Sequence, residues 1–297
     1  MADLHINKKG WEFQWTPEED KIIRENYTSK GYGELESMLP NRTKKAIQAR
    51  AFKLGVRFLS YNKDYFNNID TPTKAYWLGF LYADGYTTID DRWGLEIMKS
   101  DEEHLQNLLN EIEYSGKMKG RKRENTETCS VLIKNKDMTN SLKQKGVIPN
   151  KTEVLTFPAL EILNPMFYKD FIRGFFDGDG YVTYTVKPRV RKDRNNKVYN
   201  RVFKEINFCC KSKLFIDVLN SILKKNGICF NMYLNAKHNN LYYLRTSNIQ
   251  TTRNFYDFIY SDSIPKNRLK RKYDKFSLLL EGGDAYHDKR TNYCTTG

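Results

Sequence analysis

The feature that most constrains this chain is a ten-residue segment that occurs twice. The copies read YWLGFLYADG, from Tyr76, and FIRGFFDGDG, from Phe171; they align without a gap, and each ends in Asp-Gly. Each copy has two small residues four apart, Gly79 with Ala83 and Gly174 with Gly178. On a helix that spacing puts both small residues on one face, so that two helix backbones can approach closely. We therefore predict two related halves that pack through these segments.

The sequence after each copy has the same order of expected elements. After the first copy we expect strands near 86–89 and 93–99, a helix over 100–112, strands near 117–123 and 129–134, and a helix over 137–146. After the second we expect strands near 181–187 and 202–211, a helix from Ser212, strands near 229–234 and 241–245, and a helix over 249–260. Apolar residues recur at helical spacing in the helices. The predicted fold class is α+β, with two pseudo-symmetric αββαββα halves.

The repeated aspartates carry the chemistry of this prediction. Asp84 and Asp179 occupy the same place in the two copies, 95 residues apart. A carboxylate in the last turn faces the negative end of the helix dipole, at a cost of ~0.3–1 kcal/mol, and the glycine after it suits a left-handed helix end. If the helices pack together, the two carboxylates also repel each other. One copy alone would indicate a packing helix, but two indicate a bound divalent cation, for which Mg²⁺ is the natural candidate.

Residues 11–59 are expected to form a small three-helix unit. Thr16 and Pro17 are signals for the start of the first helix. A turn is expected at 31–33, followed by a short helix at ELESML, and Thr43 is expected to cap a third helix that ends at Gly55. A linker is expected at 60–70.

The balance of charge indicates a polyanionic partner. The chain has 50 Lys and Arg against 36 Asp and Glu, a net charge of +14. Such an excess is most often associated with nucleic acid, although a merely basic surface would give the same number. Two basic stretches coincide with expected hairpins, where solvated loops are the plain alternative. Their candidate DNA-binding residues are Lys119, Arg121, Lys122, Arg123, Lys187, Arg189, Arg191, Lys192 and Arg194.

Other classes of protein are excluded or disfavoured by what the sequence lacks. No apolar run approaches the roughly 20 residues of a membrane span, and the first residues lack the apolar stretch of a signal peptide. Five cysteines without a CxxC pair indicate a reducing compartment, cytoplasmic or organellar rather than secreted. Four histidines without HExxH or zinc spacing, and no phosphate-binding glycine loop, remove the commoner metal and nucleotide sites.

The duplicated motif resembles that of the LAGLIDADG homing endonucleases, over halves at 71–164 and 165–276. The resemblance implies a monomeric pseudo-dimer whose two sheets form a DNA-binding saddle. It also implies that Asp84 and Asp179 bind two or three Mg²⁺ ions, for which Mn²⁺ can substitute. The same resemblance implies basic groups near the metals, which by position are Lys99, Lys211, Lys134 and Arg245. Motif position six, usually acidic, is Asp177 in the second copy but Tyr82 in the first.

The N-terminal unit resembles the Myb/SANT-like helix-turn-helix domains, through Trp15, Thr16, the acids at 18–20 and the third helix. This resemblance implies a DNA-binding surface formed by Arg42, Lys44, Lys45, Gln48 and Arg50. Some modules of this type bind protein instead, and that alternative stays open. The segment 277–297 is expected to be a flexible tail.

Together these patterns predict a site-specific double-strand DNA endonuclease of homing type. The reaction would be metal-dependent phosphodiester hydrolysis, and the family implies a staggered cut with 3′ overhangs. Two alternatives remain on the same fold: an RNA maturase that assists intron splicing, and a non-cleaving DNA-binding regulator. The presence of both aspartates argues against the regulator, and the helix-turn-helix resemblance argues mildly against the maturase.

Overall fold

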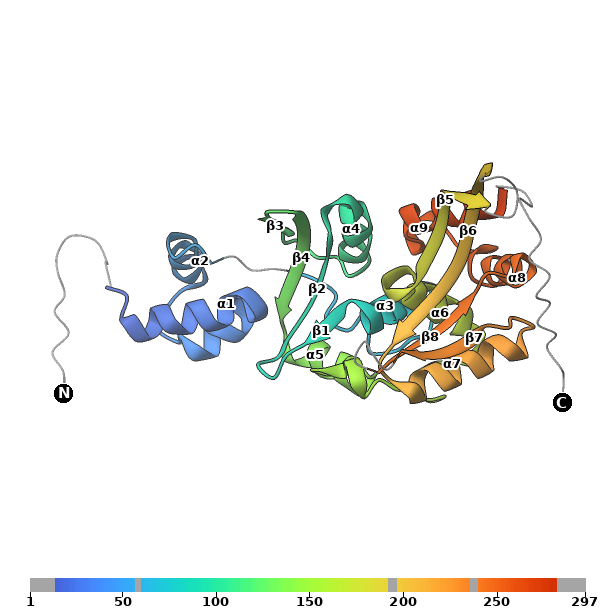
Figure 1. The fold of residues 1–297 in the computed structure, drawn as a ribbon. Coiled ribbons are helices and arrows are strands. Elements are labelled where there is room, and N and C mark those ends of the chain that lie inside the picture. The colour runs from blue at the N-terminus through green and yellow to red at the C-terminus, as the bar shows by residue number, and fades with distance from the viewer. Residues whose placement is uncertain (1–13, 57–59, 192–196, 236–239, 282–297) are drawn as a thin grey trace, which may run out of the picture. The chain divides into compact units, whose positions relative to one another are not determined.

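The computed structural model describes residues 14–56, 60–191, 197–235 and 240–281 (Figure 1). The chain divides into two compact units. The smaller unit contains Met1–Tyr61 with Glu113–Gly116, and the larger contains Asn62–Ile112 and Lys117–Gly297. In the described residues, no helix is both long enough and apolar enough to cross a membrane.

The smaller unit is built on the helices α1 (Pro17–Met38) and α2 (Lys44–Lys53). The start of α1 agrees with the prediction: the Thr16 hydroxyl accepts from Glu19 N at 3.2 Å, and the Glu19 carboxylate accepts from Thr16 N at 2.9 Å. This reciprocal capping satisfies two main-chain donors that a helix start leaves unpaired. The predicted cap of α2 is also confirmed, because the Thr43 side chain accepts from Ala46 N at 3.2 Å.

The prediction of a turn at residues 31–33 is wrong. Helix α1, 22 residues long, continues through them, so the described residues of this unit form two helices where three were expected. Two glycines inside a helix cost about 1 kcal/mol each. Continuation keeps Ile23, Tyr27, Leu35 and Leu39, all spaced by multiples of four, together in one buried cluster with residues of α2. Burial of such side chains is worth about 1.5–3 kcal/mol each, enough to offset the glycines.

The larger unit contains the predicted αββαββα pattern twice (Figure 1). The first half consists of α3 (Pro72–Ala83), β1 (Gly85–Thr87), β2 (Arg92–Met98), α4 (Glu102–Glu111), β3 (Lys119–Arg123), β4 (Thr126–Lys134) and α5 (Lys136–Gln144). The second consists of α6 (Tyr168–Asp179), β5 (Tyr181–Arg191), β6 (Lys197–Cys210), α7 (Lys213–Lys225), β7 (Asn231–Asn235), β8 (Leu241–Thr246) and α8 (Ile249–Tyr260). The antiparallel sheets have equivalent strand orders, β1-β2-β4-β3 and β5-β6-β8-β7. The predicted fold class is confirmed.

One further helix follows the second half. Helix α9 spans Lys270–Glu281 and buries Lys272, Phe276 and Leu279. The helix includes residues 277–281, which were expected to belong to a flexible tail. Residues 282–297 lie outside the described part of the chain. Phe276 packs on Phe176 of α6 and on Phe255 of α8. Burial of Phe276 and Leu279, three residues apart on one helix face, accounts for the longer helix.

The two motif helices, α3 and α6, pack backbone against backbone. A Cβ atom added to Gly79 would lie 2.0 Å from the carbonyl oxygen of Phe171, and one added to Gly174 would lie 1.9 Å from that of Tyr76. No side chain larger than hydrogen fits at either place. The small residues of the repeat therefore have the packing role that their spacing predicted.

The glycine after each aspartate has a different role from the one predicted. Gly180 has a φ of −72°, and Gly85 is not among the described glycines with positive φ. Both are instead confined by the preceding helix turn: an added Cβ would lie 2.6 Å from a Leu81 methyl at Gly85, and 2.2 Å from the Phe176 ring at Gly180. Close approach, rather than a left-handed conformation, accounts for glycine here.

Each sheet has one face packed on helices and one open face. In β2 the side chains of Trp93, Leu95 and Ile97 are buried, so the alternate residues Glu96 and Met98 lie on the open face. In the second sheet Val182, Ile206 and Phe208 are buried in the same way. We call the two solvated sides the open faces; the strand registers below assign the remaining residues to them.

Candidate functional site

The packing of α3 on α6 brings Asp84 and Asp179 to the same end of the helix pair. Asp84 follows the last residue of α3, and Asp179 is the last residue of α6. A Cβ added to Gly178 would lie 2.2 Å from the Ala83 Cβ and 3.3 Å from Asp84 Oδ2, so the two helix ends touch. The predicted convergence of two carboxylates is therefore part of this fold.

The surroundings of the pair disfavour its negative charge. Protein atoms surround both side chains, and this partial burial raises the pKa of Asp84. Burial, and next the charge of Asp84, raise the pKa of Asp179 to about 6. Water nevertheless reaches both carboxylates, because both residues are exposed at the surface. The pair is thus accessible, crowded by its own charge and poised to accept a cation.

Two lysines that the sequence analysis did not select lie at the ends of these helices. The Lys151 ammonium group donates to the carbonyl oxygens of Ala83 and Gly85, at the end of α3. The Lys272 ammonium group donates to Phe176 O at 2.8 Å and Gly178 O at 2.7 Å, at the end of α6. Each half therefore has one lysine that satisfies the free carbonyls of its motif helix, where a cation also offsets the helix dipole.

These lysines also act on the aspartates. The charges of Lys272 and Lys151 each lower the pKa of Asp84 and of Asp179, against the effect of burial. Burial in turn lowers the pKa of Lys151, and lowers that of Lys272 to about 8. The arrangement is a compact group of two carboxylates and two ammonium groups.

A weak sequence signal could have identified this lysine pair. After its last helix, each half continues with an Ile-Pro pair, at Ile148 and at Ile264, and the lysine follows within eight residues. The repeat thus extends beyond the segments compared in the sequence analysis. Lys272 lies in the basic run 266–272, where a surface role for all the basic residues would have hidden the buried lysine.

Of the four predicted basic groups, Lys211 is the one that lines a cavity together with Asp179. Lys211, Lys151, Cys209 and Asp179 line one cavity of about 190 Å³. The ammonium group of Lys211 is 3.2 Å from Glu153 Oε1, an exposed carboxylate. Lys211 can therefore reach a ligand in the same cavity as Asp179.

The other three predicted basic groups have different surroundings. Lys99 forms an ion pair with Glu102 at the start of α4, and its ammonium group is half-exposed. Lys134 ends β4 opposite Arg92, on the open face of the first sheet. Arg245 lies on the open face of the second sheet, with its guanidinium 4.6 Å from the ring centre of Tyr233 and 3.8 Å from Glu205.

The donor set at the aspartate pair fits a hard divalent cation. Its groups are two carboxylates, whose oxygens Mg²⁺ and Ca²⁺ prefer. In the part of the chain that the structure describes, no group of three or more His, Cys, Asp or Glu side chains could hold a metal ion. An ion here would take its other ligands from water or phosphate oxygens, the usual situation for Mg²⁺.

Motif position six differs between the halves in structure as well as in sequence. Asp177 is fully buried and accepts from Tyr76 Oη at 2.8 Å, Tyr260 Oη at 2.6 Å and Leu269 N at 2.8 Å. Tyr82 instead donates its hydroxyl hydrogen to the carbonyl of Lys145. Asp177 thus joins α3, α8 and the segment before α9, and has no direct path to solvent.

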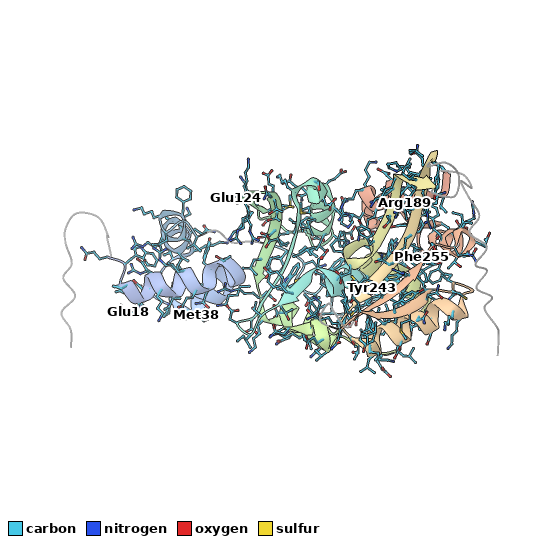
Figure 2. All side chains as sticks on the ribbon, viewed as in Figure 1. Glu18, Met38, Glu124, Arg189, Tyr243 and Phe255 are labelled. Carbon is cyan, nitrogen blue, oxygen red and sulfur yellow. The ribbon has the colours of Figure 1, made fainter. Side chains whose placement is uncertain are left out.

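The predicted basic hairpin residues divide between the sheet faces. Alternation along β3 puts Lys119, Arg121 and Arg123 on the open face and Lys122 on the opposite side. Lys187 and Arg189 lie on the open face of the second sheet, with their cationic groups 6.0 Å and 5.7 Å from the ring centre of Phe203. Figure 2 labels Arg189 on the β5–β6 hairpin. The remaining predicted residues of this hairpin, Lys192 and Arg194, lie outside the described residues, as does the side chain of Arg191.

In the smaller unit, two of the predicted DNA-contacting residues are already engaged. The Arg42 guanidinium donates to both oxygens of Glu19 at 2.7 Å and lies 4.3 Å from the ring centre of Trp15. The Arg50 guanidinium donates to both oxygens of Asp20, at 2.7 and 2.6 Å. These bidentate pairs hold α2 on the first turn of α1. The other three members of the predicted set, Lys44, Lys45 and Gln48, are exposed on α2.

Comparisons with known proteins find one family model and several solved structures that are similar to this chain. Residues 166–260 match the LAGLIDADG-like domain. Among solved structures, the I-SmaMI LAGLIDADG homing endonuclease bound to cleaved DNA is 13% identical, with a TM-score of 0.48, over 72% of this chain and 89% of that one. The I-LtrWI LAGLIDADG homing endonuclease bound to target DNA is 11% identical, with a TM-score of 0.46, over 74% and 91%. A comparison with curated protein sequences gives no match.

Proposed function

We propose that this protein is a site-specific double-strand DNA endonuclease that hydrolyses one phosphodiester bond in each strand. The observation that carries the proposal is the pair Asp84 and Asp179, two accessible carboxylates held together at the ends of duplicated helices. A fold gains nothing from two like charges at two negative helix ends. Such a pair is useful when a cation and a phosphate are bound beside it.

The proposed substrate fits the charge of the open faces. Five basic side chains from the predicted set lie on them, at Lys119, Arg121, Arg123, Lys187 and Arg189. Antiparallel ribbons of this kind can enter the major groove, where each base pair presents a distinct pattern of donors and acceptors. Lysines and arginines on such a surface neutralise phosphates and set the register of the duplex.

In the proposed reaction the chain's own groups have three roles. Asp84 and Asp179 hold divalent ions, Mg²⁺ or Mn²⁺, which when bound supply Lewis acidity and lower the pKa of water. Lys211 and Arg245 stabilise the negative charge that develops on the phosphate oxygens. Lys151 and Lys272 are positioning residues: by occupying the carbonyls at the helix ends, they fix the direction of both aspartates.

The test of this proposal is cleavage of a randomised duplex library by the full chain. With Mg²⁺, we expect a defined subset of sequences to be cut in both strands at staggered positions. With EDTA in place of Mg²⁺, the same library should be bound but left intact. Absence of cleavage under every divalent ion tried, or equal cleavage in EDTA, would contradict the proposal.

We also propose that the smaller unit contacts DNA, through Lys44, Lys45 and Gln48. Because Arg42 and Arg50 are bound to acids of α1, we leave them out of this surface. Replacing the three α2 residues with alanine should weaken duplex binding by about tenfold to a hundredfold, as loss of one of two tethered modules does. Lys21→Ala, on the exposed side of α1, is the matched control. Unchanged binding by the triple variant would favour a protein-binding role for this unit.

A further inference from the structure

The two sheets end in outer strands of opposite character. β3 closes the first sheet and β7 closes the second (Figure 1), and within the described part of the chain each is paired with one strand only. β3 reads KGRKR, with four cations in five residues, whereas β7 reads NMYLN and has no charge. Natural proteins commonly protect an outer strand with charges, because its outward main-chain groups can pair with another chain. β3 has this protection and β7 does not.

The strand β7 also exposes large apolar side chains. Met232 is 42%, Tyr233 is 45% and Leu234 is 53% exposed. Tyr233 lies on the open face beside Arg245. Met232 and Leu234 alternate with it and lie on the helix-packed side, where Met232 pairs with the buried Leu244. Exposed apolar side chains along an uncharged outer strand indicate a surface that binds another chain.

The sequence of β7 is nearly the same when it is read in either direction. Tyr233 is at its centre, Met232 and Leu234 flank it, and the strand begins and ends with asparagine. A two-fold axis at Tyr233 would therefore pair asparagine with asparagine, tyrosine with tyrosine, and methionine with leucine in an antiparallel ladder. A two-fold contact requires a surface that complements itself. β7 meets this requirement, whereas two copies of the cationic β3 would repel each other.

We infer that two copies of this chain associate through β7, antiparallel and centred on Tyr233. The two sheets then continue into one sheet of eight strands, four from each copy. Paired residues of antiparallel strands project to the same face, so both open faces lie on one side and stay uncovered. Five strand residues from each copy compare with about 20–30 residues a side in a standard interface, so the association is reversible. This inference does not depend on the proposed function.

Sedimentation equilibrium of the full chain without DNA tests whether the copies associate. We expect the mass to rise with protein concentration, from that of one chain towards that of two. Each copy has a net charge of +14, and salt screens the repulsion between copies, so association should strengthen as salt rises. DNA binding has the opposite dependence on salt. The salt series therefore separates self-association from bridging by nucleic acid.

Charge substitutions at the centre of the strand test the register. Tyr233→Lys and Tyr233→Glu each put two like charges opposite each other on the two-fold axis, so each variant alone should have a dissociation constant about tenfold higher or more. A mixture of the two variants pairs a lysine with a glutamate and should restore association between unlike chains. Ile89→Lys and Ile89→Glu, at a residue that is 94% exposed and lies outside β7, are the matched controls and should associate as wild type does.

A second pair of variants repeats the test without replacing Tyr233, which contacts Arg245. In the same register Leu234 of one copy faces Met232 of the other. Leu234→Lys and Met232→Glu should therefore each weaken association when alone and restore it when mixed. Circular dichroism of every variant checks that it is folded.

Two results would overturn the inference. A wild-type chain that has the mass of one copy at every concentration and salt would exclude self-association and leave β7 to a strand of a different protein. Association that the folded β7 variants do not weaken, or that their mixtures do not restore, would place the contact on another surface of the chain.

Discussion

The two halves of the larger unit share one architecture and differ in the chemistry that it carries. Strand order, helix order and the packing glycines are the same in both. Among the differences are three positions near the motif helices and on the open faces: Tyr82 against Asp177, Met98 against Lys211, and Leu132 against Arg245. The comparison teaches that the fold requires only the packing residues to be repeated. The polar residues near the aspartates need not be the same in the two halves, so the two halves can differ in their chemistry.

The largest expected effect is on the packing of α3 against α6, to which both halves contribute a glycine. Gly174→Ala would put a methyl carbon 1.9 Å from the Tyr76 carbonyl oxygen, so α3 and α6 would have to separate. Overpacking by one methyl in a rigid backbone contact should cost at least about 3 kcal/mol of unfolding free energy. Urea denaturation measures this loss of unfolding free energy. Gly120→Ala is the control, because nothing lies within 4 Å of the added carbon; an equal loss there would contradict the contact argument.

The next largest effect concerns motif position six, where the two halves have different residues. Asp177→Ala leaves Tyr260 Oη and Leu269 N without a buried partner and Tyr76 Oη with His104 alone, and should cost about 3–5 kcal/mol. Tyr82→Phe removes one hydrogen bond, to Lys145 O, and should cost about 1 kcal/mol. Urea denaturation of the two variants measures both losses of unfolding free energy, and we expect the loss in Asp177→Ala to be the larger. Similar losses would mean that the second half does not depend on its acid more than the first depends on its tyrosine.

A smaller effect concerns pH. His104 packs on Phe80 as Phe215 packs on Phe175, with ring centres 5.0 and 4.5 Å apart. Because the Tyr76 hydroxyl donates to Asp177, His104 Nε2 must donate to Tyr76 Oη, across 2.8 Å. Burial, and next the charge of Arg271, lower the pKa of His104 to about 3, so the folded state holds it neutral.

The neutral, buried His104 makes the folded chain less stable at low pH. In the unfolded chain His104 gains a proton below its ordinary pKa of about 6.5, and the folded state does not. Its contribution to stability is therefore complete above pH 6.5 and is lost as the pH falls towards 3. Between pH 7 and 5, wild type should lose about 1–2 kcal/mol more than His104→Phe, which copies the second half. Parallel pH profiles of unfolding free energy would contradict a neutral buried His104.

The smallest expected effects compare the open faces. Replacing Lys119, Arg121 and Arg123 with alanine should lower the salt slope of duplex binding by up to about 2.7, at about 0.9 per phosphate. Replacing Lys187 and Arg189 should lower it by up to about 1.8. Lys122→Ala, on the other side of β3, should leave the slope unchanged. If Lys122 matters as much as its neighbours, the assignment of the open face is wrong.

Much of the larger unit could be predicted because its signals are local and duplicated. The small residues at Gly79 and Gly174 and the alternation of apolar residues in the strands gave the elements and their order. The aspartate pair followed from the same repeat. Where a single local signal had to compete with tertiary packing, prediction failed: the glycines of α1 indicated a turn, but burial of Leu35 and Leu39 keeps the helix continuous.

The rest of the site depends on register and on distant contacts. The equivalence of Met98 with Lys211 appears only when the cross-strand pairs are known, because one residue of slip exchanges it for Lys99. Lys151 and Lys272 approach the aspartates from the ends of the two halves, across 66 to 96 residues of sequence. The Ile-Pro pairs could mark the two lysines, but no pattern within ten residues shows which carbonyls they contact.

The central claim is that Asp84 and Asp179 serve a reaction rather than the fold, and the double variant Asp84→Asn with Asp179→Asn tests it most directly. Burial raises the pKa of both carboxyls, so ionisation costs the folded state stability above pH 4. Their neutral amides should leave the unfolding free energy in EDTA unchanged or raise it by ~0.5–2 kcal/mol, at the lower end because water reaches both groups.

Duplex binding in EDTA should be retained by this variant, because the basic open faces are unchanged, while cleavage in Mg²⁺ should be abolished. When all three properties are measured on one preparation, we expect the double variant to be at least as stable as wild type, to bind DNA and not to cut it. A double variant that still cuts in Mg²⁺, or one that is unfolded in EDTA, would contradict the account.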